Sequence, residues 1–486
     1  MLFARIALFI FVMFSTPSFG QVDEAIRAYE SGDYDNAFRT INAAAKDGQA
    51  NAQFYLGESY FNGRGAPQDF SQAIRWYEKS AKQGYQDAQV KLGNLYLTGK
   101  YVEKDASLGA SWYLKAALSG NTEAALIAGS LYFDGQEVPK DVNKAIAAYE
   151  VSAKAGDVDS HEMLGYIYFS GILGTPDYTN AFKWYVKAAE DGRVYPKFAL
   201  GWMYYNGKGA QKNLAQAASY LKQAADLGSI QASTLVAFMY SNGEGVENNS
   251  TLAFEYLQKS AEGGDVASYA TLAWAYYQGD GVDKDPKKAF EWFKKASKSE
   301  DSQSAFMVAY MLQQGDGVVK SARDAIGWYE TAANAGYAEA HGALGHIYFF
   351  GDDGVPPNHS EAMKWYRPVA ESGDAYAQYM MGFMCEQGKN VPHKPDEAVK
   401  WFSLAANQGD LSSQIRLAWM FYEGSGIAKD LVLSYMWSNL AATASKGEER
   451  EQLENLRNYI ATVLSPDELK LAQKKTREWK PASKPN

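Results

Sequence analysis

Cysteine is almost absent from this chain of 486 residues, which contains only Cys385. A chain with one thiol cannot form an internal disulfide, so no disulfide framework holds the fold together. Cys385 occupies a position where most copies of the repeat described below carry tyrosine. We therefore expect it to be a buried core residue.

Histidine is scarce, and no two histidines have the spacing H-x-x-x-H that holds a metal on one helix face. His341 and His346 are five residues apart, which places them on different helical faces. An acidic loop at 279–285 faintly resembles a calcium loop but lacks the glutamate at the twelfth position, so we interpret it as a solvated turn. The sequence predicts no metal and no cofactor. The five histidines are His161, His341, His346, His359 and His393.

Three further features are missing, and each absence excludes a class of function. No G-x-S-x-G motif, phosphate-binding Walker loop or Cys–His nucleophile pattern occurs, which argues against an enzyme. No basic block interrupts a formal net charge of −10. This balance argues against nucleic acid and against anionic membrane surfaces as partners. After the first twenty residues, no apolar run is long enough to span a membrane.

Those first twenty residues, MLFARIALFIFVMFSTPSFG, differ from the rest of the chain. Arg5 gives a short positive region, Ile6 to Phe14 are all apolar, and Ser18 and Gly20 supply the small residues of a cleavage site. The pattern is typical of a signal peptide cleaved near Gly20. No cysteine follows that site, so lipid attachment there is excluded. We expect a periplasmic or secreted protein with no membrane span in its mature chain.

What the sequence does contain is a repeat with a period of 36 residues. One slot holds a small residue, Gly or Ala, in all eleven copies, and a single extra residue in the loop 351–354 makes one step 37. A period of this size indicates a repeat architecture. The members of this small slot are Gly57, Gly93, Gly129, Gly165, Gly201, Ala237, Ala273, Ala309, Gly345, Gly382 and Ala418.

Aromatic residues keep phase with the small slot. A tyrosine follows it by three residues in eight copies, and another aromatic follows it by nineteen or twenty residues in every copy except the third, which has Ala148. We interpret these slots as core packing. The second row consists of Trp76, Trp112, Trp184, Tyr220, Tyr256, Trp292, Trp328, Trp365, Trp401 and Trp437.

Each copy indicates two helices. In the first copy, apolar and small residues from Ala52 to Gly63 share one helical face, and the glycines that follow end the helix. Asp69 predicts the N-cap of a second helix over Phe70–Lys82. Glycine in a helix costs roughly 1 kcal/mol relative to alanine. Its recurrence in the small slot therefore predicts close approach of a neighbouring helix.

A pair of short helices cannot bury its own apolar face, so the copies are expected to stack. The segments AQFYLGESYFNGRG…DFSQAIRWYEKSAKQG and SQIRLAWMFYEGSG…DLVLSYMWSNLAA carry the shared pattern. This pattern resembles the Sel1-like repeat, a relative of the tetratricopeptide repeat. The resemblance implies an all-α fold, a right-handed α/α superhelical solenoid of about eleven repeats with helical caps. It also implies a bacterial exported member of a family of adaptors, without the cysteine pairs that staple each repeat in some members.

The expected domain organisation follows from where the period starts and stops. The ranges are 1–20 for the signal peptide, 21–49 for a tetratricopeptide-like cap, 50–445 for the eleven repeats, 446–480 for a C-terminal helical cap and 481–486 for a disordered tail. Ser465 and Glu468 have the spacing of a capping box that opens the last helix. Pro368 is expected to kink a second helix, and Glu300 stands where other copies have glycine.

The residue directly after the small slot points away from the core face of the first helix. The first three copies carry Glu58, Asn94 and Ser130 there, whereas the next eight carry a ring. By resemblance to tetratricopeptide repeats, this slot lies on the concave surface that holds peptides. The candidate ligand-binding residues are Tyr166, Trp202, Phe238, Trp274, Tyr310, His346, Phe383 and Trp419, with Phe54, Phe198, Phe306 and Tyr379 one turn earlier.

Two interpretations of these rings stay open. They either pack between adjacent first helices or line a groove for an extended peptide, a helix or a glycan, because aromatic residues serve as binding anchors. We expect a non-catalytic protein-interaction scaffold of the cell envelope with a protein or peptide partner. The alternative is a factor that binds cell-wall or exported polysaccharide. A third hypothesis, a hydrolase, is disfavoured by the missing nucleophile.

Overall fold

The computed structural model describes residues 17–389 and 391–482. Within these residues the regular secondary structure is α-helical, apart from an isolated bridge between Asp352 and Val355. The predicted all-α class is confirmed. No helix in this described part is long and apolar enough to cross a membrane. Most of the expected signal peptide and most of the expected tail lie outside the described residues.

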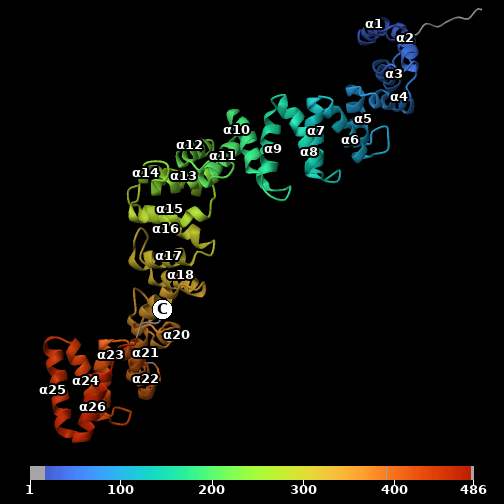
Figure 1. Cartoon of the computed structure of the whole chain (residues 1–486). Helices are drawn as coiled ribbons and strands as arrows, with labels where there is room; N and C mark the ends of the chain where they lie inside the picture. The colour runs from blue at the N-terminus through green and yellow to red at the C-terminus, as the bar shows by residue number, and fades with distance from the viewer. Residues whose placement is uncertain (1–16, 390, 483–486) are drawn as a thin grey trace, which may run out of the picture. The chain divides into compact units, whose positions relative to one another are not determined.

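The chain divides into two compact units, Met1–Glu247 and Asn248–Asn486 (Figure 1). The first unit contains α1 (Phe19–Glu30), α2 (Tyr34–Lys46), α3 (Ala50–Asn62), α4 (Phe70–Lys82), α5 (Gln86–Thr98), α6 (Ala106–Leu118), α7 (Thr122–Asp134), α8 (Val142–Lys154), α9 (Val158–Ser170), α10 (Tyr178–Glu190), α11 (Val194–Asn206), α12 (Leu214–Asp226) and α13 (Ile230–Asn242).

The second unit continues the same alternation of helices. It contains α14 (Ser250–Glu262), α15 (Ala267–Gln278), α16 (Pro286–Ser297), α17 (Ser302–Gln314), α18 (Ala322–Asn334), α19 (Ala338–Phe350), α20 (His359–Glu371), α21 (Ala375–Gln387), α22 (Pro395–Asn407), α23 (Leu411–Glu423), α24 (Leu431–Ala444), α25 (Gly447–Val463) and α26 (Pro466–Glu478).

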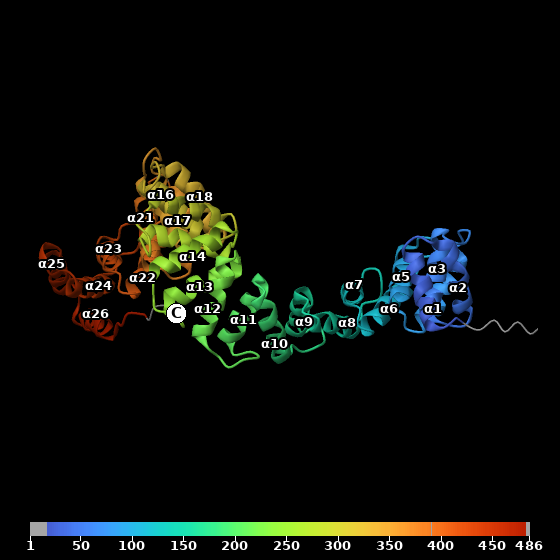
Figure 2. The ribbon, with the colours of Figure 1, turned by 90° about the horizontal axis from the view of Figure 1, so that it is seen from above.

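Each repeat is a helical pair, and within each unit each pair packs on the next (Figure 2). The odd-numbered helices from α3 to α23 are the first helices of the repeats, and the even-numbered helices from α4 to α24 are the second. In the first repeat, Gly63 adopts a left-handed φ of 69° directly after α3, which glycine does without steric cost. The Asp69 side chain accepts a hydrogen bond of 3.0 Å from the Gln72 backbone N–H. The predicted second helix and its cap are therefore confirmed.

The small slot lets a large side chain of the second helix lie against the first. A Cβ atom added at Gly57 would stand 2.7 Å from the ring of Tyr77, and at Gly345 it would stand 2.8 Å from the ring of Tyr366. The predicted close approach is thus to the second helix of the same repeat. The buried side chains of this row, called here the ring row, are Tyr77, Tyr113, Tyr149, Tyr185, Leu221, Phe293, Tyr329, Tyr366 and Phe402.

The tryptophan-rich row that begins with Trp76 stands one residue before the ring row, and it is less buried than we predicted. Trp112, Tyr256, Trp365 and Trp437 are buried, whereas the other six members are half-buried. Several half-buried rings are covered by a lysine one turn later, as when the Lys295 ammonium lies 3.7 Å from the centre of the Trp292 ring. The tryptophan-rich row therefore lies between the core and solvent, and the ring row forms the core.

Successive repeats are joined by a polar side chain in the first helix. Gln53 donates a hydrogen bond of 3.1 Å to the carbonyl oxygen of Ala45, at the end of the preceding helix, and His161 Nε2 lies 3.0 Å from the carbonyl oxygen of Ala153. These bonds satisfy carbonyl groups that a helix C-terminus leaves unpaired. The same bond is made by Gln89, Gln378 and Gln414.

Two departures from the repeat have different outcomes. Glu300 adopts a positive φ of 64°, as the glycines in this turn do, which strains a residue that carries a side chain. Pro368 lies inside α20, which nevertheless runs without interruption from His359 to Glu371 and matches most of the other second helices in length. The proline therefore does not end its helix.

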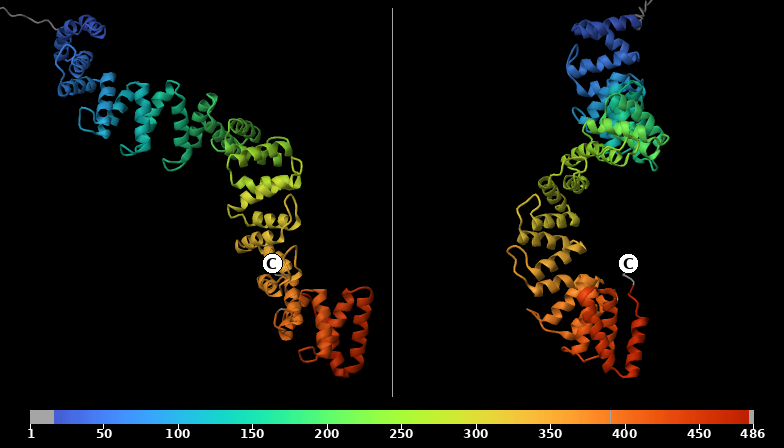
Figure 3. Two further views of the ribbon diagram at one scale, coloured as in Figure 1. Left: turned by 180° about the vertical axis from the view of Figure 1, so that it is seen from behind. Right: turned by 90° about the vertical axis from the view of Figure 1, so that its left-hand side faces the viewer.

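Helical caps lie at both ends of the described chain. The helix α1 begins at Phe19, two residues before the expected cap, with Ser18 forming a capping box with Gln21. At the other end, α25 and α26 both pack on α24, and the three helices lie side by side (Figure 3). The predicted capping box of Ser465 and Glu468 is present at the start of α26.

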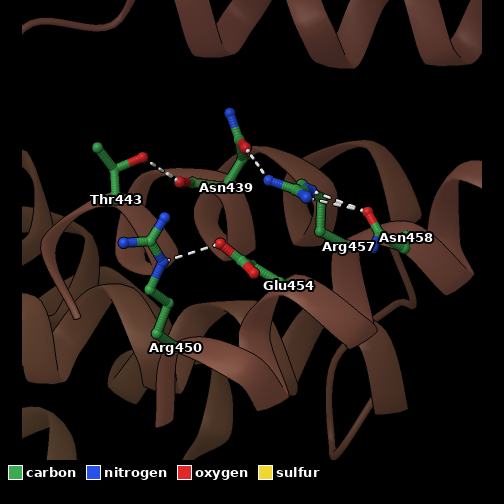
Figure 4. A network of polar contacts seen from close by, with 6 residues as sticks. All are labelled: Asn439, Thr443, Arg450, Glu454, Arg457 and Asn458. Atoms are coloured by element: carbon green, nitrogen blue, oxygen red, sulfur yellow. Dashed lines mark hydrogen bonds and ion pairs between the residues drawn. The ribbon is translucent and has the colours of Figure 1, made fainter. Parts of the chain in front are cut away.

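A polar network on α24 and α25 secures the C-terminal cap. Arg457 Nη1 donates a hydrogen bond of 2.9 Å to Asn439 Oδ1, which links the two helices (Figure 4). Along α25, Arg450 Nε donates to Glu454 at 2.9 Å. This hydrogen bond lowers the pKa of the Glu454 carboxyl. Arg457, Asn439 and Glu454 are half-buried, and their contacts hold α25 against α24.

Candidate binding surface on the first helices

The eight rings that follow the small slot, called here the aromatic row, all lie on first helices and none is fully buried. Tyr166 is 40% exposed, Phe238 48% and Tyr310 38%, and His346 is also exposed. Trp202, Trp274, Phe383 and Trp419 are half-buried. In the first unit the row comprises Tyr166 (α9), Trp202 (α11) and Phe238 (α13), and in the second Trp274 (α15), Tyr310 (α17), His346 (α19), Phe383 (α21) and Trp419 (α23).

Some of these rings do pack between consecutive first helices. Tyr166 meets the edge of Phe133 on α7 with ring centres 6.3 Å apart, and Trp202 meets Phe169 on α9 at 5.2 Å. In the second unit, Phe383 meets Phe349 on α19 at 5.9 Å. Each contact joins neighbouring repeats, so these rings contribute to stacking while part of each remains exposed.

Other rings of the row make contacts within their own repeat. Trp274 lies edge-on to Phe293 of α16, with centres 5.1 Å apart. His346 packs on Phe350 at 4.5 Å, and Trp419 meets Tyr422 at 6.1 Å. The aromatic row therefore consists of partly packed rings that also present apolar surface to solvent.

The four rings expected one turn earlier, Phe54, Phe198, Phe306 and Tyr379, are all half-buried. Tyr379 contacts Phe383 of the aromatic row, with ring centres 6.1 Å apart. Phe198 instead contacts Tyr195, which is 38% exposed and which the sequence analysis did not select. The signal for Tyr195 was present, because it stands seven residues before Trp202 and thus two turns away on the same helix face.

In the first three repeats the slot directly after the small residue is polar, and in the first repeat it holds Glu58. Its carboxylate accepts a hydrogen bond of 2.5 Å from the Tyr77 hydroxyl and lies 2.9 Å from the Lys91 ammonium of the next repeat. Lys91 also covers the ring of Phe61 at 4.6 Å. Burial, followed by the negative charge of Glu58, raises the pKa of Tyr77 well above its ordinary value. The Glu58 carboxylate therefore has two partners within the protein.

A similar arrangement occurs near the end of the second unit. Arg416 lies 3.6 Å from the Glu386 carboxylate and covers the ring of Phe383 at 5.3 Å. A basic residue two positions before the small slot thus covers a ring of the preceding repeat in both units. Such a cation contributes about 0.5–1 kcal/mol at an exposed site.

Two open depressions lie beside second helices, one in each unit. In the first unit, an open depression of about 600 Å³ is lined by Tyr168, Phe182 and Trp184 among others. In the second unit, a depression of about 620 Å³ is lined by Pro395, Lys400 and Trp401 among others. No group of His, Cys, Asp and Glu side chains in the described part of the chain is arranged to hold a metal ion.

Comparison with known proteins supports the repeat assignment. The family model described as Sel1 repeat matches eleven consecutive segments. No curated protein sequence matches the chain. The matched segments are 50–85, 86–121, 122–157, 158–192, 197–229, 230–265, 267–301, 302–337, 338–374, 375–410 and 411–446.

Several solved structures are similar. A protective antigen of uropathogenic Escherichia coli strains with an SLR fold is 32% identical, and the match covers 91% of this chain and 94% of that chain, with a TM-score of 0.49. A Sel1 repeat protein from Oxalobacter formigenes is 27% identical over 66% of this chain and 93% of that chain, with a TM-score of 0.42. Helicobacter pylori cysteine rich protein B is 29% identical over 27% and 96%, with a TM-score of 0.22.

The segments matched by the family model coincide with the helical pairs of the structure. Sel1 repeat proteins are generally scaffolds for protein–protein interaction and are generally not enzymes. With eleven matched repeats that span residues 50–446, the chain belongs to the Sel1 repeat family.

Proposed function

We propose that this protein is a non-catalytic scaffold that binds a segment of a partner protein on the first-helix face, with the aromatic row as its anchor. The observation that carries the proposal is the partial exposure of every ring in the row. Rings that served packing alone would be buried like Tyr185 or Phe293. Aromatic side chains that offer apolar area at a low cost in conformational entropy are typical binding anchors.

Two exposed rings of the row, one in each unit, give a sharp test. Phe238 and Tyr310 are 48% and 38% exposed, so replacing them with serine removes apolar surface while most core contacts remain. In-cell crosslinking followed by mass spectrometry should capture a partner with the wild type. The capture should be lost in the variant Phe238→Ser/Tyr310→Ser, while the helical signal in circular dichroism is unchanged.

The control variant changes exposed apolar residues away from the row. Leu118 and Leu227 are exposed at the ends of second helices, so Leu118→Ser/Leu227→Ser should leave the captured partner unchanged. If the row variant keeps the same partners as the wild type, the aromatic row does not bind, and the search moves to the depressions beside the second helices.

The alternative proposal is that the exposed rings bind polysaccharide, because the apolar faces of sugars stack on aromatic rings. Intrinsic tryptophan fluorescence distinguishes the two functions. Soluble cell-wall fragments that shift the emission of the wild type, but not of Trp202→Phe/Trp274→Phe, would favour the polysaccharide. An emission spectrum that no saccharide changes, together with loss of a crosslinked protein, would favour the protein partner.

We also propose that the protein is exported, with cleavage near Gly20. The support is the positive, apolar and small-residue pattern of the first twenty residues. Expression with a C-terminal tag in a bacterial host, followed by fractionation and intact-mass measurement, should give a periplasmic or secreted product that begins at Gln21. A cytoplasmic product with its first twenty residues intact would contradict export.

A further inference from the structure

One surface in the first unit has chemistry that the rest of the aromatic row lacks. It is formed where side chains of α9 and α11 meet, and it contains Glu162, Tyr166 and Tyr195, with the buried Tyr185 of α10 against Tyr195; we call it the tyrosine surface. The rings of Tyr166 and Tyr195 are 6.4 Å apart, and those of Tyr185 and Tyr195 are 5.9 Å apart.

The Tyr185 hydroxyl differs from its equivalents in two other repeats and resembles that of Tyr366 in the ninth repeat, which is also buried without a hydrogen-bond partner. In the first repeat the equivalent hydroxyl, of Tyr77, donates to Glu58 at 2.5 Å. In the eighth, Tyr329 donates to Gln313 at 2.9 Å. The Tyr185 side chain is completely buried. Its hydroxyl makes no hydrogen bond of normal geometry, and its nearest polar neighbour is the Tyr195 side chain. A buried polar group without a partner costs about 1–3 kcal/mol, so an acceptor supplied from outside would be stabilising.

The carboxylate of Glu162 is only partly compensated. Arg193 makes its close ion pair with Asp159, and its Nε atom stays 3.8 Å from Glu162. Burial raises the pKa of the Glu162 carboxyl, and Arg193 opposes that shift. This environment differs from that of Glu58, which is bound by both Lys91 and Tyr77. Glu162 therefore retains attraction for a further cation.

Acidic side chains near the tyrosine surface also favour a cation. Tyr195 takes the place that the acidic residues Asp87, Glu123 and Asp159 occupy on the preceding first helices, and all three are exposed. Asp134, at the end of α7, is exposed as well. Arg193 is the basic residue paired with this cluster. The tyrosine surface is thus flanked by negative charge on its N-terminal side.

An exposed tyrosine pair beside a half-buried carboxylate has the chemistry of a cation site. Ammonium and guanidinium groups bind to carboxylates and to the faces of aromatic rings. We propose that the tyrosine surface takes a lysine or arginine side chain from an extended, basic partner segment, while a backbone carbonyl of that segment accepts from Tyr185. This inference rests on the proposed scaffold function and specifies its partner as basic.

Binding in this way requires the Tyr195 side chain to move. It lies against Tyr185 and is 38% exposed, so a change of its side-chain rotamer would uncover the Tyr185 hydroxyl without disturbing the core. The Arg193 guanidinium would keep its bond to Asp159, because its contact with Glu162 is the longer of the two.

Three fluorescein-labelled peptides test the proposal. They contain three copies of Gly-Ser-Lys-Leu, Gly-Ser-Gln-Leu or Gly-Ser-Glu-Leu, and their binding to the purified protein is followed by fluorescence anisotropy. We expect the lysine peptide to bind about tenfold more tightly than the glutamine peptide. The glutamate peptide should bind more weakly than both, and high salt should reduce the difference.

Variants assign this preference to the tyrosine surface. Glu162→Gln should abolish the preference for lysine and leave the affinity for the glutamine peptide within about twofold. Tyr185→Phe should weaken binding of the lysine peptide without lowering the melting temperature, because the hydroxyl makes no hydrogen bond of normal geometry that the variant would lose. The matched control is Glu58→Gln, whose carboxylate already has internal partners and whose removal should leave the preference intact.

The outcomes separate this inference from the scaffold proposal. If lysine and glutamine peptides bind equally, or if the preference survives in Glu162→Gln, the tyrosine surface does not select a cation. Loss of binding of both peptides in Phe238→Ser/Tyr310→Ser would then still support the aromatic row. Failure of the lysine peptide to bind overturns the inference, whereas an unchanged crosslinking pattern in the row variant overturns the scaffold proposal.

Discussion

At the scale of single residues, two glycines three positions apart on α19 have opposite roles. A Cβ atom at Gly345 would stand 2.8 Å from the Tyr366 ring, whereas at Gly342 it would find nothing within 4 Å. Gly345 makes room for the ring row, and Gly342 only lowers helix propensity. The difference shows that residue type alone does not tell whether a glycine in a helix is required for packing.

Alanine substitutions at these two glycines are therefore expected to act in opposite directions. Gly345→Ala should destabilise the second unit by about 1–3 kcal/mol through overpacking, whereas Gly342→Ala should stabilise it by about 0.5–1 kcal/mol through helix propensity. Urea unfolding followed by circular dichroism measures both changes. Equal shifts of the unfolding midpoint would show that the ring of Tyr366 yields to the added methyl group.

The same argument applies with more force to Gly201, where an added Cβ would stand 2.5 Å from Leu221 Cγ. Gly201→Leu should destabilise the neighbouring repeats by several kcal/mol, because neither helix can move without disturbing the next pair. Thermal unfolding of the variant measures the loss. An unchanged melting temperature would show that the small slot does not require a small residue.

Cys385 should be chemically silent in the folded protein. Its side chain is 1% exposed, and burial raises the pKa of the thiol to about 11. Near pH 8 almost no thiolate forms, and the thiolate is the reactive species. A thiol-specific chromogenic reagent should label the protein only after denaturant is added. Rapid labelling of the native protein, with unchanged circular dichroism, would place Cys385 at the surface.

Buried tyrosines should make stability depend on alkaline pH. Burial, followed by the charge of Asp134, raises the pKa of Tyr149 from 10.0 to about 12. A raised pKa in the folded state stabilises the protein below the unfolded value, and this contribution is lost as pH rises through the folded value. Stability should therefore fall between about pH 10 and pH 12.

Tyrosinate absorbance in the near ultraviolet checks this expectation when it is followed together with circular dichroism. Part of the tyrosine signal should titrate only as the helices unfold. A smooth titration of all tyrosines near pH 10, with the helical signal intact, would contradict the burial of the ring row.

At the scale of helices and turns, Glu300 identifies a weak point. It adopts a φ of 64° after α16, where the first repeat has Gly84 with a φ of 89°. Glu300→Gly should stabilise the second unit by about 1 kcal/mol, because glycine adopts this conformation without strain. Denaturant midpoints compare the variant with Glu300→Gln, which keeps the side chain. Equal midpoints would show that the turn tolerates a side chain at no cost.

The helical pattern could be predicted closely because each local signal agreed with the period. The bounds of α4, the cap at Asp69 and the capping box at Ser465 were all evident from residue type and spacing. One feature was not. The ring row stands directly after the tryptophan-rich row, and periodicity alone does not show which of two adjacent aromatic residues faces inward.

At the scale of the whole molecule, each helical pair contacts mainly the pairs before and after it. Deletion of residues 122–157, one complete repeat of the first unit, should therefore preserve the fold with a modest loss of stability. Deletion of residues 140–157, which removes only α8, should unfold the surrounding repeats because α7 loses its partner. Circular dichroism and thermal melting compare the two, and similar behaviour of both deletions would contradict stacking by complete repeats.

The candidate surface was less predictable than the fold. Slot counting located the aromatic row, and the structure shows each ring to be at least partly exposed, but partial packing against Phe133, Phe169 and Phe349 depends on side-chain geometry that spacing does not give. The tyrosine surface depends on the hydroxyl of Tyr185, which makes no hydrogen bond of normal geometry. That property is visible only when the partners of its equivalents in other repeats are known.

The bonds from Gln53 and its equivalents to the preceding carbonyl groups also have a mechanical meaning. Within each unit the repeats are connected in series, so a pulling force applied to the ends would act on every such junction at once. The weakest junction would open first, and each event would release one repeat of 36 residues. At about 3.4 Å per extended residue, each released repeat adds roughly 120 Å of chain. Under tension the protein would lengthen in near-equal steps, as a chain of similar links does.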